Sequence, residues 1–253
     1  MSNGVTTAEY VKWQSKKAVE KFYELSAWTD EDYIVYNGLL EALKNSYKKC
    51  SKEEENPILA KIKGDALENI VNFIIEKSYF LEVYPNKRNG TNEIDNLIVI
   101  SDYGEQTFDM HNISKKLLGF DGDYFLGECK NYDDTVGVTW VGKFNTLLSI
   151  CGDCNFGVIF SYKGLAGAED KWYSSHGLTK IIFKLSGNKK YILDFNINDF
   201  ELLKNKKYNL FKILKAKKKS LVTGCKSENL YEPHDGAEEM KEIYNELLDS
   251  RYI

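Results

Sequence analysis

The stretch Gly127-Glu128-Cys129-Lys130 places a carboxylate and an amine two positions apart at the end of an apolar run. Side chains two apart on a β-strand lie on the same face, so Glu128 and Lys130 would project together while Cys129 points the other way. Taken alone, this spacing is typical of an ordinary ion pair. Whether Glu128 and Lys130 could form part of a reactive site therefore depends on which other acidic residues lie near them.

Two further carboxylates, those of Asp95 and Glu68, could lie near Glu128 and Lys130. Asp95 stands in NEIDNLIVI, at the start of another apolar strand, where a carboxylate costs solvation free energy unless it meets a cation. Two strand-borne carboxylates could converge on one Mg²⁺, which proteins bind through one or two carboxylates, with waters and substrate phosphate completing the shell. Glu68, in KGDALENIVNFII, flanks the apolar face of a predicted helix. Periodicity alone favours an exposed helical glutamate at this position.

Hydrophobic periodicity predicts the elements that would carry these residues. Residues 7–50 have helical spacing and indicate a helical hairpin in front of the main domain. Pro57 is suited to the first turn of a third helix, which would extend to about Lys77, and Gly64 would allow a kink or a break in it. The period then changes to short apolar runs on both sides of the turn-rich PNKRNGTN, which predicts a β-hairpin.

The second half of the pattern continues this α/β order. A connection at 101–122 without a strong period leads into the strand that ends with GECK, and helical spacing returns at 138–151. FGVIFSY predicts a strand buried on both faces, KIIFKL and KKYILDF predict further strands, and 197–219 predicts a basic helix. From Pro57 to Tyr162 the predicted order is therefore helix, strand, strand, strand, helix, strand.

The order and spacing of these motifs resemble the PD-(D/E)XK nuclease superfamily, and more closely its Mrr-like restriction endonuclease branch. The resemblance is carried by GDALEN on a helix, EID, a strand ending GECKN, and GVIFSYKGLAG, over about residues 61–168. It implies a restriction-endonuclease-like core, a mixed central sheet flanked by helices, within residues 56–200. An N-terminal helical extension at 1–55 and a basic, then acidic, helical region at 201–253 would flank this core.

The resemblance also implies a role for each site residue. In that family the aspartate and the glutamate bind a divalent metal, which corresponds to Asp95 and Glu128, with Mg²⁺ as the expected ion and Mn²⁺ as its substitute. The backbone carbonyl of Cys129 would be a further ligand, Lys130 would position and activate the attacking water, and Glu68 would act through a metal-bound water. A carboxylate-bound Mg²⁺ suits phosphodiester cleavage, because it relieves charge on the phosphate and stabilises the leaving oxygen.

Of the other acids, which include Asp109 and Asp121, two compete most directly with Asp95 for the metal role. Asp123 is the main rival, although its strand parity opposes that of Glu128, and Glu93 shares a face with Asp95 and could assist or replace it. Other chemistries have less support, since the sequence contains no G-x-S-x-G nucleophile elbow and no P-loop. Cys151 and Cys154 have the spacing of half a zinc site, and a pair of free thiols is the preferred interpretation.

The net charge of −4 conceals an uneven distribution of signs. Eight lysines and no acidic residue lie between Lys204 and Lys219, and residues 228–249 are largely acidic. Such a basic strip could hold phosphates even on an acidic protein, and a solvated helix face is an equally good explanation. The candidate nucleic-acid contacts are Lys143, Lys206, Lys207 and Lys215.

Cellular location and partners follow from composition and from the resemblance. No stretch approaches the roughly 20 apolar residues of a membrane span, and MSNGVTTAEY lacks the features of a signal peptide, so we expect a cytoplasmic protein without membrane contact. Five cysteines at irregular spacings fit free thiols in a reducing compartment.

The expected function is that of a Mg²⁺-dependent endonuclease acting on DNA, in restriction or defence against foreign DNA. The family resemblance implies a homodimer, and a partner subunit of a defence system fits the same role. Three alternatives stay open from the sequence. The first is a junction-resolving, repair or RNA-cleaving nuclease of the same fold, the second is a non-catalytic nucleic-acid-binding module, and the third is an interaction protein that uses its N-terminal helices.

Overall fold

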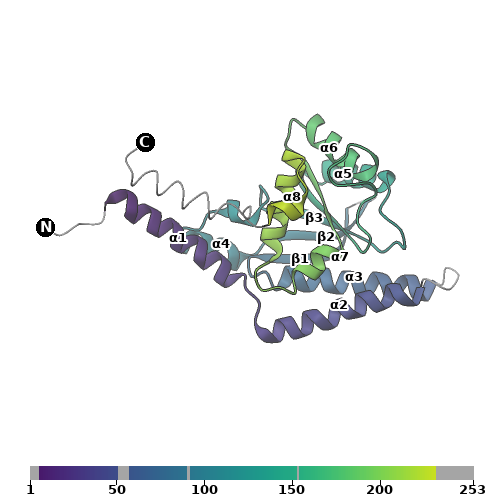
Figure 1. The fold of residues 1–253 in the computed structure, drawn as a ribbon, viewed down its shortest axis with the longest axis horizontal. Coiled ribbons are helices and arrows are strands. Elements are labelled where there is room, and N and C mark those ends of the chain that lie inside the picture. Colours follow the sequence, from purple (N-terminus) through teal and green to yellow (C-terminus); the bar gives the residue numbers. More distant parts are fainter. Residues whose placement is uncertain (1–5, 51–56, 90–91, 153, 232–253) are drawn as a thin grey trace, which may run out of the picture.

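The computed structural model describes residues 6–50, 57–89, 92–152 and 154–231. The chain has an α/β fold with a five-stranded mixed sheet flanked by helices (Figure 1). The strands lie in the sheet in chain order: β1 (Leu81–Asn89), β2 (Asn92–Ile100), β3 (Tyr124–Lys130), β4 (Phe156–Ser161) and β5 (Tyr191–Phe195). The predicted order of strands and flanking helices from Pro57 to Tyr162 is confirmed, except that helical structure at residues 102–118 stands between the second and third strands.

Helices surround this sheet on both faces. The α-helices are α1 (Thr7–Leu25), α2 (Asp30–Cys50), α3 (Pro57–Glu76), α4 (Asp102–Met110), α5 (Val138–Ile150), α6 (Ser174–Leu185), α7 (Ile197–Leu202) and α8 (Leu210–Thr223). Two short 3₁₀ helices, η1 (Lys115–Leu118) and η2 (Ser227–Leu230), complete the described elements. The connection at 101–122 therefore contains helical structure, in α4 and η1, that its weak period did not predict.

Strand β3 joins two kinds of pairing. It is antiparallel to β2 and parallel to β4, while β1 pairs antiparallel with β2 and β5 pairs parallel with β4. Parallel neighbours require a crossover that returns the chain to the starting edge, and α5 and α6 provide the two crossovers. The carboxyl ends of β3, β4 and β5 consequently lie at one edge of the sheet.

The prediction of a strand at KIIFKL was wrong, because this segment is the second half of α6. The helix buries Thr179, Ile182 and Phe183, which recur at helical spacing. A strand at this position would leave β4 and β5 without the crossover that their parallel pairing needs.

The N-terminal helices do not form the predicted hairpin. Helix α2 lies along α3 and runs in the opposite direction, whereas α1 extends away from both (Figure 1). An ion pair of 2.7 Å between Asp32 and Lys77 joins the start of α2 to the end of α3. Helix α1 reaches the core through Phe22, whose ring stacks on Phe80 at 4.7 Å between centroids.

Two buried clusters hold the sheet between its helices. The larger one joins α2, α3 and α8 to one face of the sheet, through residues such as Leu40, Ile70 and Phe211. The smaller one packs α5 and α6 on the other face, through Leu126 of β3, Ile159 of β4 and Ile192 of β5. Side chains of β3 therefore alternate between the two clusters, which fixes the direction of every residue on this strand.

The basic stretch at 197–219 is two helices, α7 and α8, instead of one. Helix α8 is capped by Asn209, whose side chain accepts a hydrogen bond from the Lys212 N–H. In the described ranges no helix is long and apolar enough to cross a membrane.

Candidate functional site

The site begins where strands β2 and β3 stop pairing. Their ladder runs from Val99 and Tyr124 to Asn96 and Gly127, and it includes no residue pair beyond Gly127. Beyond this point the carboxylate of Asp95 still links β2 to β3, because its Oδ2 accepts a hydrogen bond of 2.9 Å from the N–H of Cys129. A strand carbonyl would occupy this place in a regular ladder, so Asp95 is fixed beside the last residues of β3.

Glu128 and Lys130 lie on the same face of β3, as their spacing predicts. The Lys130 ammonium is 2.5 Å from Oε1 of Glu128 and 3.9 Å from Oδ2 of Asp95. The side chains of Glu128, Lys130 and Asp95 are 14, 15 and 25 % exposed, so solvent screens these charges only partly. Cys129 points to the opposite face, where its Sγ accepts a hydrogen bond of 3.4 Å from Asn96.

The segment that follows β3 attaches helix α3 to the site. Asn131 donates to the Ala60 carbonyl at 2.8 Å, and Lys63 forms an ion pair with Asp133. Helix α3 is continuous across Gly64, so the kink that the sequence allowed does not occur. A Cβ at Gly64 would lie 3.1 Å from Nδ2 of Asn131, so the glycine permits the close approach of these two segments.

Glu68 is carried to the site by this attachment. Its side chain is half-buried, in contrast to the exposed glutamate that periodicity favoured. Burial raises the pKa of Glu68 first, and the negative charge of Asp95 raises it further. The two carboxylates therefore interact electrostatically across the gap between α3 and β2.

The pKa values of Asp95, Glu128 and Lys130 are also shifted by burial and by neighbouring charges. Burial raises the pKa of Asp95 and of Glu128, and the negative charge of Asp95 adds to the rise at Glu128, while Lys130 opposes both rises. Burial lowers the pKa of Lys130, but the carboxylates of Glu128 and Asp95 outweigh it and leave the pKa raised. Lys130 is thus held in its protonated form. Three carboxylates with one ammonium leave an excess of negative charge, which favours the approach of a cation.

The donor set fits a hard divalent cation. Within the described part of the chain, no three carboxylate, thiol or imidazole side chains form a ready-made metal cage. Mg²⁺ does not require one, because it is usually held by one or two carboxylates and keeps several waters. Asp95 and Glu128 offer such a pair of oxygen ligands. The N–H and C=O of a strand residue point to the same side, so the Cys129 carbonyl also faces the gap between β2 and β3.

The two competing acids have different positions. Asp123 lies before the first residue of β3, has a side chain that is 84 % exposed, and pairs with Lys115 at 3.8 Å. Five residue steps of extended chain, about 16 Å, separate its backbone from that of Glu128. Glu93 is exposed and pairs with Arg88 at 3.6 Å, although its charge raises the pKa of both Asp95 and Glu128. Of the acids weighed from the sequence, Asp95 is the one in contact with β3.

The four candidate nucleic-acid lysines are separated by the structure. Lys143 of α5 lies beside the site, because its ammonium is 4.3 Å from the ring centroid of Trp140, which Lys130 also contacts at 4.7 Å. Lys215 donates to the Tyr23 hydroxyl of α1 at 2.9 Å. Lys206 pairs with Asp30 at the start of α2, and the neighbouring Lys207 lies in the same connection before α8. The structure therefore groups only Lys143 with Lys130.

Lys217 has a role that the basic strip did not indicate. Its ammonium lies 2.8 Å from Oδ2 of Asp199, and both side chains are almost fully buried. Helical periodicity contained the signal, since Leu210, Ile213, Leu214 and Lys217 recur on one face of α8.

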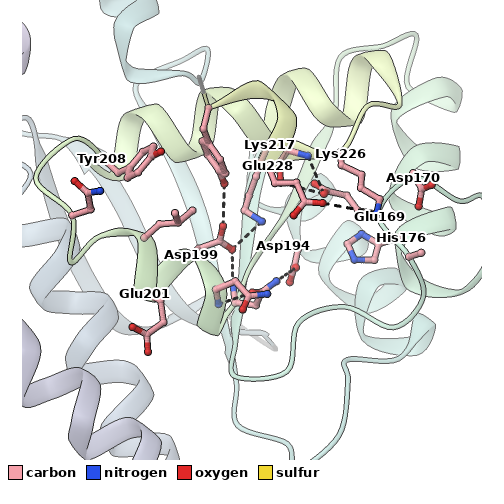
Figure 2. A pocket seen from close by; sticks show the side chains of 17 residues that line it. Glu169, Asp170, His176, Asp194, Asp199, Glu201, Tyr208, Lys217, Lys226 and Glu228 are labelled. Atoms are coloured by element: carbon pink, nitrogen blue, oxygen red, sulfur yellow. Dashed lines mark hydrogen bonds and ion pairs between the residues drawn. The ribbon is translucent and has the colours of Figure 1, made fainter. Parts of the chain in front are cut away.

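A polar cavity of about 920 Å³ lies apart from the candidate catalytic residues, beyond the carboxyl end of β5 (Figure 2). It was not predicted from the sequence. Two of its acidic residues accept hydrogen bonds from neighbouring segments: Asp194 accepts the Leu165 N–H at 3.1 Å, and Glu169 accepts the Ser220 hydroxyl at 2.9 Å. Figure 2 shows Asp199 joined by a dashed line to the ammonium of Lys217. These contacts hold the connections around β5 in place.

The cysteines show no metal site in the described residues. Cys129, Cys151, Cys154 and Cys225 are free thiols, as predicted. The buried Cys154 donates its thiol to the Phe156 carbonyl at 3.2 Å.

Comparison of the chain with models of protein families, with curated proteins and with solved structures gave no match. The chemistry of the site therefore follows from Asp95, Glu128 and Lys130, with Glu68 beside them. This set can hold a hard cation, orient a water molecule and balance the negative charge of a substrate.

Proposed function

We propose that this chain is a metal-dependent endonuclease with a PD-(D/E)XK, restriction-endonuclease-like core, which hydrolyses phosphodiester bonds of DNA. The observation that carries the proposal is the meeting of Asp95 and Glu128 at one protonated lysine, Lys130, where β2 and β3 diverge. The order of helix α3, strands β1 to β3, helix α5 and strand β4 supports it.

Each residue has a defined part in the proposed reaction. Asp95 and Glu128, with the Cys129 carbonyl, would hold Mg²⁺, for which Mn²⁺ would substitute. When bound, the ion supplies charge relief on the phosphate and a more acidic water. Lys130 keeps its proton because of the two carboxylates, so it orients the attacking water and offsets charge on the phosphate. Glu68 accepts a hydrogen bond from a water in the same site.

The biological role belongs to the same proposal. A nuclease of this kind acts on DNA in the cytoplasm, in restriction or in defence against foreign DNA. Nucleases that cut both strands of a duplex often act as dimers, so we propose a homodimer, and a partner subunit of a defence system would supply further recognition.

Cleavage of plasmid and phage DNA, modified and unmodified, tests the activity. We expect Mg²⁺-dependent cleavage, and we expect Asp95→Asn, Glu128→Gln and Lys130→Ala to lower the rate about 10² or more, as loss of a catalytic group does. Asp123→Asn is the matched control and should leave the rate within about twofold, because surface changes outside the site have small effects. Cleavage by Asp95→Asn and Lys130→Ala at the wild-type rate would contradict the assignment of these residues to the catalytic site.

Metal binding can be measured without a substrate. A ligand that binds only the folded state raises its stability, so Mg²⁺ at 100 times its dissociation constant should add about 2.7 kcal/mol to the free energy of unfolding. Glu128→Gln should abolish this gain. Branched, duplex, single-stranded and RNA substrates compared in one assay then identify the substrate class.

A further inference from the structure

The indole of Trp140 lies against two cations at the candidate site. Trp140 stands in the first turn of α5, and its ring centroid is 4.7 Å from the Lys130 ammonium and 4.3 Å from that of Lys143. The ring of Tyr132 lies 5.6 Å from that of Trp140 and is inclined to it by 37°. The same aromatic residue therefore contacts both the proposed catalytic lysine and Lys143.

The Trp140 ring restrains the position of the Lys130 ammonium. A lysine side chain is long and flexible, and its ion pair with Glu128 draws the ammonium toward a carboxylate that the proposed metal also needs. The face of an indole attracts an ammonium without neutralising it or taking up its hydrogen-bond donors. Trp140 packs on the buried cluster between α5 and the sheet, so it offers a fixed surface.

The ring also brings two like charges to one aromatic side chain. The ammonium groups of Lys130 and Lys143 repel each other, and the electron-rich face of one indole offsets that repulsion. Lys143 is exposed, whereas the Lys130 side chain is 15 % exposed. One ammonium is thus directed into the site and the other remains accessible to a polyanionic substrate.

We propose that Trp140 is a positioning residue that holds the Lys130 ammonium in the site and fixes Lys143 beside it as a contact for a neighbouring phosphate of the same strand. This inference rests on the proposed nuclease function. It assigns a role to an aromatic residue outside the set of carboxylates and lysine, and it separates the two lysines into one that acts on the reacting phosphate and one that binds the strand.

The position of Lys130 can be tested without cleavage, by NMR of the full chain labelled with ¹³C at the lysine ε-carbons. Lys130→Arg and Lys143→Arg assign the two signals. Trp140→Leu should move both signals toward the position of ordinary lysines, because the ring current is lost, and Trp140→Phe should retain part of the shift. The matched control is Trp172→Leu, which removes an exposed indole 5.8 Å from the ammonium of Lys180 and should leave both signals in place. A Lys130 signal that is unchanged in Trp140→Leu overturns the proposal.

The kinetic test separates positioning from a general structural role. Trp140→Leu should lower kcat about tenfold with little change in KM, which corresponds to the loss of one partly buried cation–π contact. Trp140→Phe should recover most of kcat, and Lys143→Ala should raise KM at nearly constant kcat. Equal losses of kcat in Trp140→Phe and Trp140→Leu, or a kcat that both retain, would overturn the proposal. A wild-type chain that cleaves no substrate contradicts the nuclease function, and the NMR signals still decide whether Trp140 positions Lys130.

Discussion

Replacement of Lys217 by methionine tests the assignment of this lysine to the core. The change removes the ammonium that lies 2.8 Å from Asp199, while its carboxylate stays almost fully buried. Breaking a buried ion pair from one side typically costs about 3–5 kcal/mol, because a buried charge is left without its partner. Asp199 keeps hydrogen bonds from the Asn196 N–H at 2.8 Å and the Tyr231 hydroxyl at 3.3 Å. These two donors place the expected loss near 3 kcal/mol, which lowers Tm by about 6–12 °C in a chain of this size.

The loss should also depend on pH in a defined direction. Burial raises the pKa of Asp199, and Lys217 opposes that rise, so removal of the lysine raises this pKa further. A carboxyl group with a raised pKa in the folded state stabilises the fold below its unfolded pKa of about 3.9, and this contribution is lost as pH rises through the folded value. The deficit of Lys217→Met relative to wild type should therefore grow from pH 4 to pH 7.

Urea unfolding followed by circular dichroism measures both effects. Lys219→Met, on the exposed face of the same helix, is the matched control and should stay within about 0.5 kcal/mol of wild type. If the two variants have equal stability, or if the deficit of Lys217→Met is constant with pH, the placement of Lys217 beside Asp199 is refuted.

Further predictions concern stability at other positions, each measured by urea unfolding. Gly142→Ala should raise the free energy of unfolding by about 0.5–1 kcal/mol, because a Cβ there meets no atom within 4 Å, and a loss would contradict the packing of α5. Gly157→Ala should cost about 1–3 kcal/mol, since its Cβ would lie 2.6 Å from an aromatic ring of α5; a neutral result would contradict this contact. Burial lowers the pKa of His176, so stability should fall as pH drops below about 6.5, and His176→Gln should flatten this dependence; an unchanged slope refutes it. Glu68→Gln should stabilise the chain at pH 7 without divalent cations and lose this advantage near pH 4, because the raised pKa of the native carboxyl makes its ionised form unfavourable; equal stability at both pH values would count against it.

The sequence contained the local part of the site. Alternation along β3 was sufficient to predict that Glu128 and Lys130 share a face and that Cys129 turns away, because side-chain direction on a strand follows from spacing alone. The helices and strands that directly flank it, α3, β1, β2, α5 and β4, were predicted for the same reason. Each of these statements depends on residues within a few positions of one another.

The local pattern did not predict which elements far apart in the sequence pack or pair with one another. The segment KIIFKL has an apolar content that suits either a strand or a helix, and the parallel pairing of β4 and β5 decides for the helix. Helix α2 has an apolar face that could have met α1 or α3, and the structure packs it on α3. The position of Asp95 also depends on pairing, since the register of β2 and β3 brings its carboxylate to the Cys129 amide.

The amide of Cys129 differs from the paired amides of β3 because a carboxylate, and not a carbonyl of a neighbouring strand, accepts its hydrogen bond. A peptide carbonyl is fixed by its chain, whereas a carboxylate can rotate, take up a proton or turn toward a cation. The rate at which this one amide exchanges its proton with solvent therefore reports what the Asp95 side chain is doing. The exchange rate of the Cys129 amide thus reports on the candidate site, and it should respond to divalent cations and to pH without any substrate.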